Sequence, residues 1–308
     1  MAFSIQPGIW PVMITPWTED NKPDFKAIAG LANWYVEQGC AGIFSICLSS
    51  EMFLLSEQEK LDIARCVTEA VDGRIQVVAS GHTADSKDDQ YRQIENMMKI
   101  PGIGAYVLVS NRMDQNKEGT EVFLRNAREI FERFPEVDFG IYECPAPFKR
   151  LLTTEELRIL ANEGRMVFMK DTCADVDLLR ERLAAVAGTP LRLFDACSQS
   201  WFDAACHGGA GFSGLMANFH PDLYAWCFRH REDQPEKARY VAHLLTLGAA
   251  ITAGYYPTNA KYYQRTYAVP MNITSRSVDY RKLDREGIGQ VESLRVVEEA
   301  LRKELGIC

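Results

Sequence analysis

Eight short apolar runs recur along the first 230 residues, and longer segments of mixed apolar and charged residues separate them. Short apolar runs are typical of buried strands, and apolar residues spaced three or four apart are typical of amphipathic helices. The expected strands are Ile9–Ile14, Gly42–Cys47, Ile75–Ala79, Ala105–Val109, Phe139–Tyr142, Met166–Lys170, Leu191–Asp195 and Gly211–Gly214. The expected helices are Phe25–Gln38, Glu57–Ala70, Lys87–Ile100, Thr120–Arg133, Thr154–Asn162, Val176–Ala187 and Gln199–Cys206. This alternation predicts a parallel sheet whose strands are joined by helices.

The number of strands distinguishes two α/β architectures. Eight strands fit a (β/α)8 TIM barrel, whereas a doubly wound sheet usually has fewer. Ser56 and Thr153 precede acidic first turns and are expected to cap two of the helices. After residue 230 only helical patterning remains, in Pro235–Ala253, Thr258–Tyr267 and Arg285–Leu305. We therefore expect a barrel over residues 1–230 and a small C-terminal helical domain over residues 231–308.

Charge and cysteine usage limit the partners of the chain. The 308 residues carry a net charge of -8, and no basic run could follow a phosphate backbone. No apolar stretch is long enough to cross a membrane, and no secretory signal precedes the first strand. The nine cysteines have no paired or metal-binding spacing, which indicates reduced thiols. We expect a cytoplasmic protein that binds neither nucleic acid nor membrane.

Polar residues at the ends of the expected strands are the candidates for chemistry, because TIM barrels react at that face. They are Thr15, Ser49, Ser50, Glu51, Ser80, Ser110, Tyr142, Glu143, Lys170, Asp171, Asp195 and Ser213.

Lys170 is the leading candidate among them. Strand alternation places it on the same face as Met166 and Phe168, so an inward orientation would bury its amine in the barrel mouth. Burial lowers the pKa of an ammonium group, and the neutral amine can attack a carbonyl to form an imine. Tyr142 ends the preceding strand, and its phenol could pass protons near such an imine. The alternatives are a solvated lysine at a strand end and a tyrosine that caps the core.

The same positions resemble the pyruvate-dependent class I aldolases typified by dihydrodipicolinate synthase and N-acetylneuraminate lyase. The resemblance covers most of the chain and identifies it as a divergent member. Matching motifs are Thr15-Pro16, Cys47-Leu48-Ser49-Ser50-Glu51, Tyr142-Glu143-Cys144-Pro145, Lys170-Asp171-Thr172, Gly208–Gly214 with Ala217-Asn218, and Tyr256-Pro257 with Lys261.

The resemblance implies roles for individual residues. Lys170 would form the imine with a 2-oxo acid, and Tyr142 would relay protons. The other implied substrate-binding residues are Thr15, Ser49, Ser50, Thr172, Ser213 and Gly214. The resemblance also implies a homotetramer and a reaction that needs no cofactor or metal.

Departures from the family pattern bear on the substrate. Where strand four should deliver tyrosines, this chain has Arg112, and Pro147 stands where the synthase carries a carboxylate-binding arginine. Glu143 would repel a second carboxylate and could instead accept hydrogen bonds from hydroxyls. We therefore expect a lyase that cleaves a deoxy-keto sugar acid into pyruvate and a neutral aldehyde. Arg112 could still bind an aldehyde that carries a carboxylate, in which case the chain would be dihydrodipicolinate synthase itself.

Three other interpretations remain open. Glu143, Asp171 and Asp195 end consecutive strands and could bind Mg²⁺ in an enolate-stabilising barrel enzyme. The glycines at 208–211 could cradle a phosphate, although close backbone packing is the simpler explanation. A non-catalytic relative could use the same pocket only to sense a 2-oxo acid.

Overall fold

The computed structural model describes residues 4–307 and contains a parallel sheet of eight strands. The strands are β1 Gly8–Ile9, β2 Gly42–Phe44, β3 Gln76–Ala79, β4 Ile103–Val109, β5 Phe139–Tyr142, β6 Met166–Asp171, β7 Arg192–Asp195 and β8 Gly211–Phe212. Neighbouring strands pair in sequence order from β2 to β8, and β8 also pairs with β1. A parallel bridge between Val12 and Phe44 joins the segment that follows β1 to β2 and nearly closes the ring. The expected (β/α)8 barrel is confirmed.

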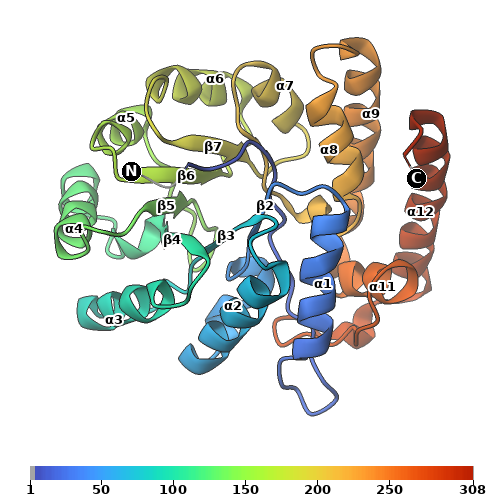
Figure 1. Cartoon of the computed structure of the whole chain (residues 1–308), viewed down its shortest axis with the longest axis horizontal. Coiled ribbons are helices and arrows are strands. Elements are labelled where there is room, and N and C mark those ends of the chain that lie inside the picture. The colour runs from blue at the N-terminus through green and yellow to red at the C-terminus, as the bar shows by residue number, and fades with distance from the viewer. Residues whose placement is uncertain (1–3, 308) are drawn as a thin grey trace.

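Helices surround this ring, as Figure 1 shows. They are α1 Phe25–Glu37, α2 Glu57–Val71, α3 Lys87–Met98, α4 Thr120–Arg133, α5 Thr154–Asn162, α6 Val176–Ala185, α7 Trp201–Cys206 and α8 Pro221–Arg229. Ser56 and Thr153 form the capping boxes of α2 and α5, as their sequences predict. The sequence patterning did not predict α8, which packs against the C-terminal helices.

The C-terminal helices stack on one side of the barrel beside α8 (Figure 1). They are α9 Pro235–Gly248, α10 Thr252–Tyr255, α11 Thr258–Tyr267 and α12 Arg285–Leu305. The segment expected as one helix over Pro235–Ala253 is divided, because α9 ends at Gly248 and a 3-10 turn, Ala249–Ile251, separates it from α10. None of the helices within residues 4–307 has the length and apolar character needed to cross a membrane. Eight cysteines of that range are free, and Cys308 lies outside it.

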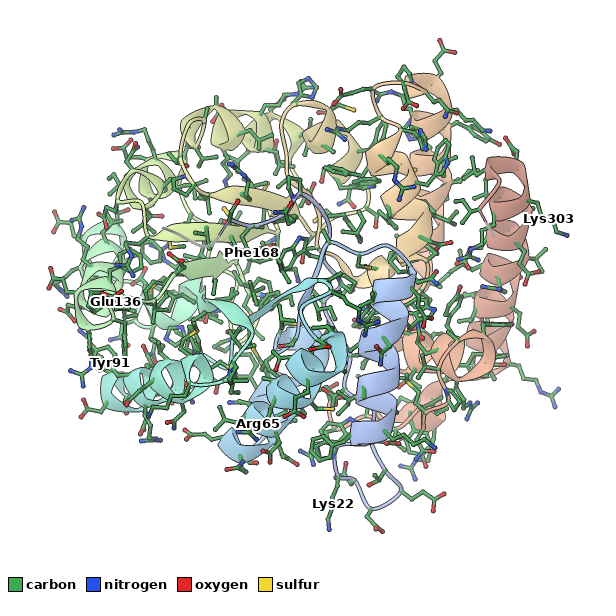
Figure 2. The ribbon with its side chains drawn as sticks, in the orientation of Figure 1. Lys22, Arg65, Tyr91, Glu136, Phe168 and Lys303 are labelled. Carbon is green, nitrogen blue, oxygen red and sulfur yellow. The ribbon has the colours of Figure 1, made fainter. Side chains whose placement is uncertain are left out.

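An aromatic cluster fills the barrel interior below the strand ends. Phe168 lies at the centre of the barrel, whereas Arg65 and Lys303 lie at the periphery of the molecule (Figure 2). The Phe168 ring contacts the rings of Trp10, Phe44 and Phe194 at centroid distances of 5.3, 5.8 and 5.0 Å. This cluster forms a floor that closes the barrel to water from below.

Glycines allow two close approaches in this part of the barrel. A Cβ on Gly42 would lie 2.5 Å from the Trp10 ring, and one on Gly211 would lie 1.8 Å from the Gly8 carbonyl oxygen. The Gly211 contact is the close packing of β8 on β1 that the sequence favoured over a phosphate loop. β1 is shorter than the expected Ile9–Ile14, because Pro11 has no N–H to donate to the sheet.

Candidate active site

A cavity of about 380 Å³ opens at the C-terminal ends of the strands. Its lining comes from the strand-end loops and from the C-terminal segment. The lining residues are Leu48, Ser49, Tyr142, Pro145, Lys170, Thr172, Ala196, Leu215, Tyr256, Pro257 and Ser277. Lys170, Tyr142, Ser49 and Thr172 were predicted from the sequence as site residues, and the cavity brings these four together. The C-terminal segment therefore does more than pack beside the barrel, because it supplies one wall of this cavity.

Lys170 and Tyr142 face each other across two neighbouring strands. They are register partners in the β5–β6 pair, and the Lys170 Nζ lies 4.3 Å from the centroid of the Tyr142 ring. Lys170 is only 4% exposed and Tyr142 only 2%. Strand alternation predicted that Lys170 points inward, and the structure has it so. The amine lies inside the cavity rather than in solvent.

Burial controls the protonation of both groups. Desolvation lowers the pKa of Lys170, and it raises the pKa of Tyr142 well above its usual value. The face of the Tyr142 ring favours the ammonium form of Lys170 by about 0.5–2 kcal/mol. Desolvation by burial acts in the opposite direction and is the leading cause of the lowered pKa. The pair therefore consists of an amine that loses its proton readily and a phenol that keeps its own.

The lowered pKa of Lys170 predicts how imine formation depends on pH. Because only the neutral amine attacks a carbonyl, the rate should rise with pH and level off below the usual lysine pKa of 10.5. The measurement is the initial rate of borohydride-trapped adduct with pyruvate from about pH 6 to about pH 10, with circular dichroism at each pH as the control. A rate that still increases about tenfold per pH unit at the upper end would show a lysine of ordinary pKa.

Hydroxyl groups supply the other polar surface of the cavity. Ser49 lies in the 3-10 turn Leu48–Ser50 and interacts with the hydroxyl of Tyr256. The Tyr256 hydroxyl also accepts a 3.1 Å hydrogen bond from the Asn218 amide. Sequence reasoning noted Tyr256 only as part of a motif and did not consider Ser277. Both lie far from the strand ends in sequence, so strand patterning could not have found them.

Glu51 connects the loop after β2 to this C-terminal wall. Its carboxylate accepts hydrogen bonds from the Trp17 indole at 2.9 Å, the Lys261 ammonium at 3.0 Å and the Ser277 backbone N–H at 2.7 Å. Lys261 is buried, and desolvation lowers its pKa to about 8. The carboxylate therefore fixes Ser277, which lines the cavity, to the loop that carries Ser49.

Four residues predicted to bind substrate are absent from the cavity lining, namely Thr15, Ser50, Ser213 and Gly214. The Ser50 hydroxyl contacts the carbonyl oxygens of Met13 and Ser45 at 2.7 and 2.6 Å. Thr15 donates to the Ser50 carbonyl at 2.8 Å, so both hydroxyls hold the loop rather than face a ligand.

Ser213 and Gly214 follow β8 and are fully buried. The Ser213 hydroxyl has no hydrogen-bond partner among residues 4–307. A Cβ on Gly214 would lie 2.3 Å from the Ala196 carbonyl oxygen, so glycine allows Ala196 its place in the cavity wall.

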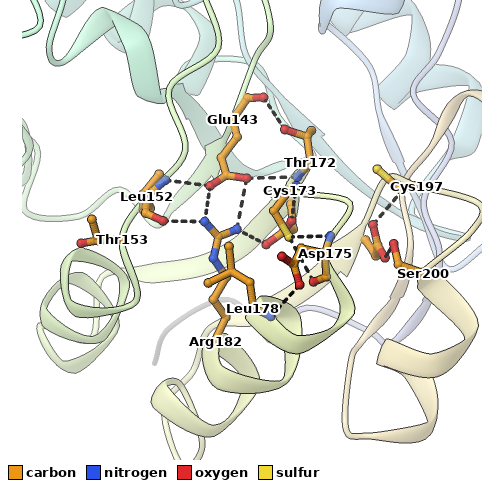
Figure 3. A network of polar contacts seen from close by, with 12 residues as sticks. Glu143, Leu152, Thr153, Thr172, Cys173, Asp175, Leu178, Arg182, Cys197 and Ser200 are labelled. Atoms are coloured by element: carbon orange, nitrogen blue, oxygen red, sulfur yellow. Dashed lines mark hydrogen bonds and ion pairs between the residues drawn. The ribbon is translucent and has the colours of Figure 1, made fainter.

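Glu143 lies behind the cavity, and protein groups occupy its carboxylate. The carboxylate accepts from Arg182 at 2.8 and 3.2 Å, from the Leu152 N–H at 2.8 Å and from the Thr172 N–H at 3.0 Å, as Figure 3 shows. Burial raises its pKa to about 6. The expectation that Glu143 accepts hydrogen bonds from substrate hydroxyls does not match this position, because alternation along β5 directs it away from Tyr142.

The carboxylates considered for Mg²⁺ also have protein partners. Asp171 forms an ion pair with Arg182, and Asp195 accepts from the Cys197 N–H at 2.8 Å and the Ser200 hydroxyl at 2.5 Å. Burial raises the pKa of Asp195 to about 7. Within residues 4–307, no group of three or more His, Cys, Asp and Glu side chains is arranged to hold a metal ion.

Arg112 lies in a different cavity, between α3 and α4. That cavity measures about 290 Å³, and Arg112 forms an ion pair there with Asp85. Its guanidinium also lies 5.4 Å from the centroid of the Phe53 ring. The structure therefore does not bring Arg112 to Lys170. Lys149 lies at the cavity edge, where its ammonium donates a 2.5 Å hydrogen bond to the carbonyl of Thr172.

A (β/α)8 barrel with a buried lysine and a tyrosine at adjacent strand ends fits the class of aldolase-type lyases. The sequence profile of the Dihydrodipicolinate synthetase family matches residues 6–277, and the chain belongs to that family. A 4-hydroxy-tetrahydrodipicolinate synthase of Jannaschia sp. (strain CCS1) is 25% identical over 220 residues, which cover 71% of this chain and 72% of that protein. The corresponding enzyme of Saccharophagus degradans is 25% identical over 238 residues, covering 76% and 79% of the two chains.

Solved structures share the fold over almost the whole chain. A prophage protein of the dihydrodipicolinic acid synthase family from E. coli K12, in complex with pyruvate, superimposes with a TM-score of 0.82 at 19% identity, covering 98% of this chain and 99% of that one. A monomeric dihydrodipicolinate synthase variant superimposes with a TM-score of 0.85 at 18% identity, covering 99% of each chain.

Proposed function

We propose that the protein is a Schiff-base lyase that releases pyruvate from a 2-oxo acid, with Lys170 as the imine-forming residue. The observation that carries the proposal is the buried Nζ of Lys170 at 4.3 Å from the Tyr142 ring, inside a cavity. A desolvated amine beside a proton-relaying phenol is the pair of groups that imine chemistry needs.

The proposed reaction begins with attack of the Lys170 amine on the C2 carbonyl, and loss of water gives the imine. The imine draws electrons from the C3–C4 bond as it breaks, which forms an enamine and an aldehyde. Because burial keeps Tyr142 from ionising, its phenol takes the proton of the C4 hydroxyl while its own proton passes to the substrate carboxylate, from which it can be returned to C3. Protonation of C3 and hydrolysis of the imine then release pyruvate and restore the lysine.

The substrate carboxylate is assigned to the side of the cavity formed by Ser49. Ser49 lines the cavity, whereas the hydroxyls of Ser50 and Thr15 bond to backbone carbonyls and hold the loop in place. Hydrogen bonds to the charged form offset the desolvation of a carboxylate. The Thr172 hydroxyl donates to the Glu143 carbonyl at 2.9 Å, so we assign Thr172 to the wall rather than to substrate binding.

The second product is proposed to be a neutral, hydroxylated aldehyde, because Lys170 is the only Lys or Arg among the described residues of the lining. The substrate would then be a deoxy-keto sugar acid. We expect pyruvate release from 2-keto-3-deoxy sugar acids to exceed condensation of pyruvate with aspartate semialdehyde by about tenfold or more. A coupled assay over both substrate types, with N-acetylneuraminate included, measures this ratio.

A specific observation supports a second candidate, condensation with an aldehyde that carries a carboxylate. Two relatives described above are named 4-hydroxy-tetrahydrodipicolinate synthases, and Lys149 provides a cation at the edge of the cavity. Efficient condensation with the semialdehyde that is lost in Lys149→Ala would favour this reaction and contradict the sugar-acid assignment. Absence of turnover with every substrate, with an intact Lys170 imine, would instead indicate a 2-oxo-acid sensor.

We also propose a cytoplasmic homotetramer, with the barrel over residues 1–230 and the C-terminal helices over 231–308. Light scattering at micromolar concentration should give about four times the mass of the 34.8 kDa chain. The monomeric synthase variant that shares this fold makes the measurement informative. A mass of one chain would contradict the tetramer.

A further inference from the structure

Arg182 of α6 connects the ends of the two strands that carry Lys170 and Tyr142. Its guanidinium donates to Glu143 at 2.8 and 3.2 Å and forms an ion pair with Asp171. Figure 3 shows the side chain reaching from α6 toward Glu143 and the backbone of Leu152. One rigid fork thus binds the residue that follows β5, the last residue of β6 and the loop between β5 and α5.

The two carboxylates have a defined relation to the candidate catalytic pair. Glu143 directly follows Tyr142, and Asp171 directly follows Lys170, so alternation places the carboxylates on the outer face and the pair on the inner face. Tyr142 and Lys170 are the last register partners of β5 and β6. Beyond this pair, the segments that follow β5 and β6 are joined by Thr172, whose N–H and hydroxyl both donate hydrogen bonds to Glu143.

Burial makes this arrangement rigid. Arg182, Glu143 and Asp171 are all 0% exposed, so water cannot replace any of their contacts. Two carboxylates share one guanidinium, and each also accepts a backbone N–H, from Thr172 for Glu143 and from Cys173 at 2.7 Å for Asp171. A small displacement of either strand end would therefore break charge-assisted hydrogen bonds in a dry environment.

We propose that Arg182 is a positioning residue that sets the distance between the Lys170 amine and the Tyr142 ring by clamping the carboxylates that follow them. This inference rests on the proposed function, because it concerns the same pair. Arg182 touches neither side chain of the pair, so its effect reaches them only through the backbone of β5 and β6.

The test separates positioning from folding with three variants. Arg182→Lys keeps the charge but replaces the fork by a single ammonium. Asp171→Ala releases the end of β6 but leaves the ion pair between Arg182 and Glu143. This pair has no net charge, so the variant buries no unpaired charge. The matched control is Arg302→Lys, because Arg302 also bridges two carboxylates, Asp222 and Glu298, on the outside of the barrel.

Two readouts are compared, each divided by the fraction of folded protein. The first is the yield of borohydride-trapped pyruvate adduct on Lys170, and the second is the rate of deuterium exchange at C3 of pyruvate. Imine formation needs the lysine alone, whereas exchange also needs a correctly placed proton acceptor. We expect Arg182→Lys and Asp171→Ala to reduce exchange by about tenfold or more with a smaller loss of adduct, and Arg302→Lys to change both by less than about twofold.

The outcomes distinguish the inference from the function on which it rests. If the unaltered protein forms an adduct on Lys170, and Arg182→Lys and Asp171→Ala both exchange as fast as Arg302→Lys, Arg182 is only structural and the inference is overturned. If the unaltered protein forms no adduct on Lys170, the proposed function fails, and the positioning role fails with it. Should Arg182→Lys not fold, Asp171→Ala alone decides between positioning and structure.

Discussion

Replacing Lys170 by arginine is expected to lower turnover of every 2-oxo acid substrate by about 10⁴-fold or more. The guanidinium keeps the long side chain, but it stays protonated and offers no nucleophilic amine. Arginine therefore removes the covalent step while keeping a long basic side chain at this position. Steady-state pyruvate release measures the loss, and circular dichroism verifies the fold.

Lys60 provides the matched control for this substitution. Lys60 lies on α2, is buried, and has a pKa that desolvation lowers to about 8. Its ammonium donates a hydrogen bond to the Thr83 hydroxyl, outside the cavity of Lys170. Lys60→Met should keep turnover within about threefold of the unaltered protein. Comparable activity of Lys170→Arg and Lys60→Met would contradict the covalent mechanism.

Replacing Tyr142 by phenylalanine is expected to lower turnover by about 10²–10⁴-fold, the usual effect of removing an acid–base group. The ring and its packing against Phe44 at 5.7 Å remain, so the fold and the floor of the cavity should persist. Imine formation should also persist, because the Lys170 amine is unaltered. The measurement pairs the turnover number with the yield of trapped adduct.

Tyr106→Phe is the matched control for the loss of a buried phenol. Tyr106 lies on β4, is fully buried, and its hydroxyl has no hydrogen-bond partner among the described residues. Its removal should leave turnover unchanged within about twofold. Equal activity of the two variants would eliminate a proton-transfer role for Tyr142.

The strand pattern predicted the barrel because each β/α unit buries its own apolar run, which is a local property of the sequence. β5 has its expected bounds, whereas β1 ends at Ile9, two residues before Pro11, which has no N–H to donate. α8 could have been recognised from Pro221 in its first turn, a common start for helices. Its rich apolar content, with Leu223, Tyr224 and Trp226 all buried, obscured the amphipathic pattern.

The pair of Lys170 and Tyr142 could be predicted for the same local reason, since strand register places the ends of neighbouring strands side by side. The position of the Glu143 carboxylate could not be predicted from the sequence. Its partner Arg182 lies 39 residues away on a helix and looks like part of a solvated helix face. Tyr256 and Ser277 were missed because only the packing of the C-terminal segment against the loop of Glu51 brings them to the cavity.

The most direct test of the central claim is mass spectrometry of the protein after borohydride reduction with pyruvate. Within residues 4–307, three buried lysines have a lowered pKa, namely Lys60, Lys170 and Lys261, and among them only Lys170 lines the cavity at the strand ends. We predict one adduct per chain, located on Lys170. An adduct on Lys60 or Lys261, or none with any 2-oxo acid, would contradict the account.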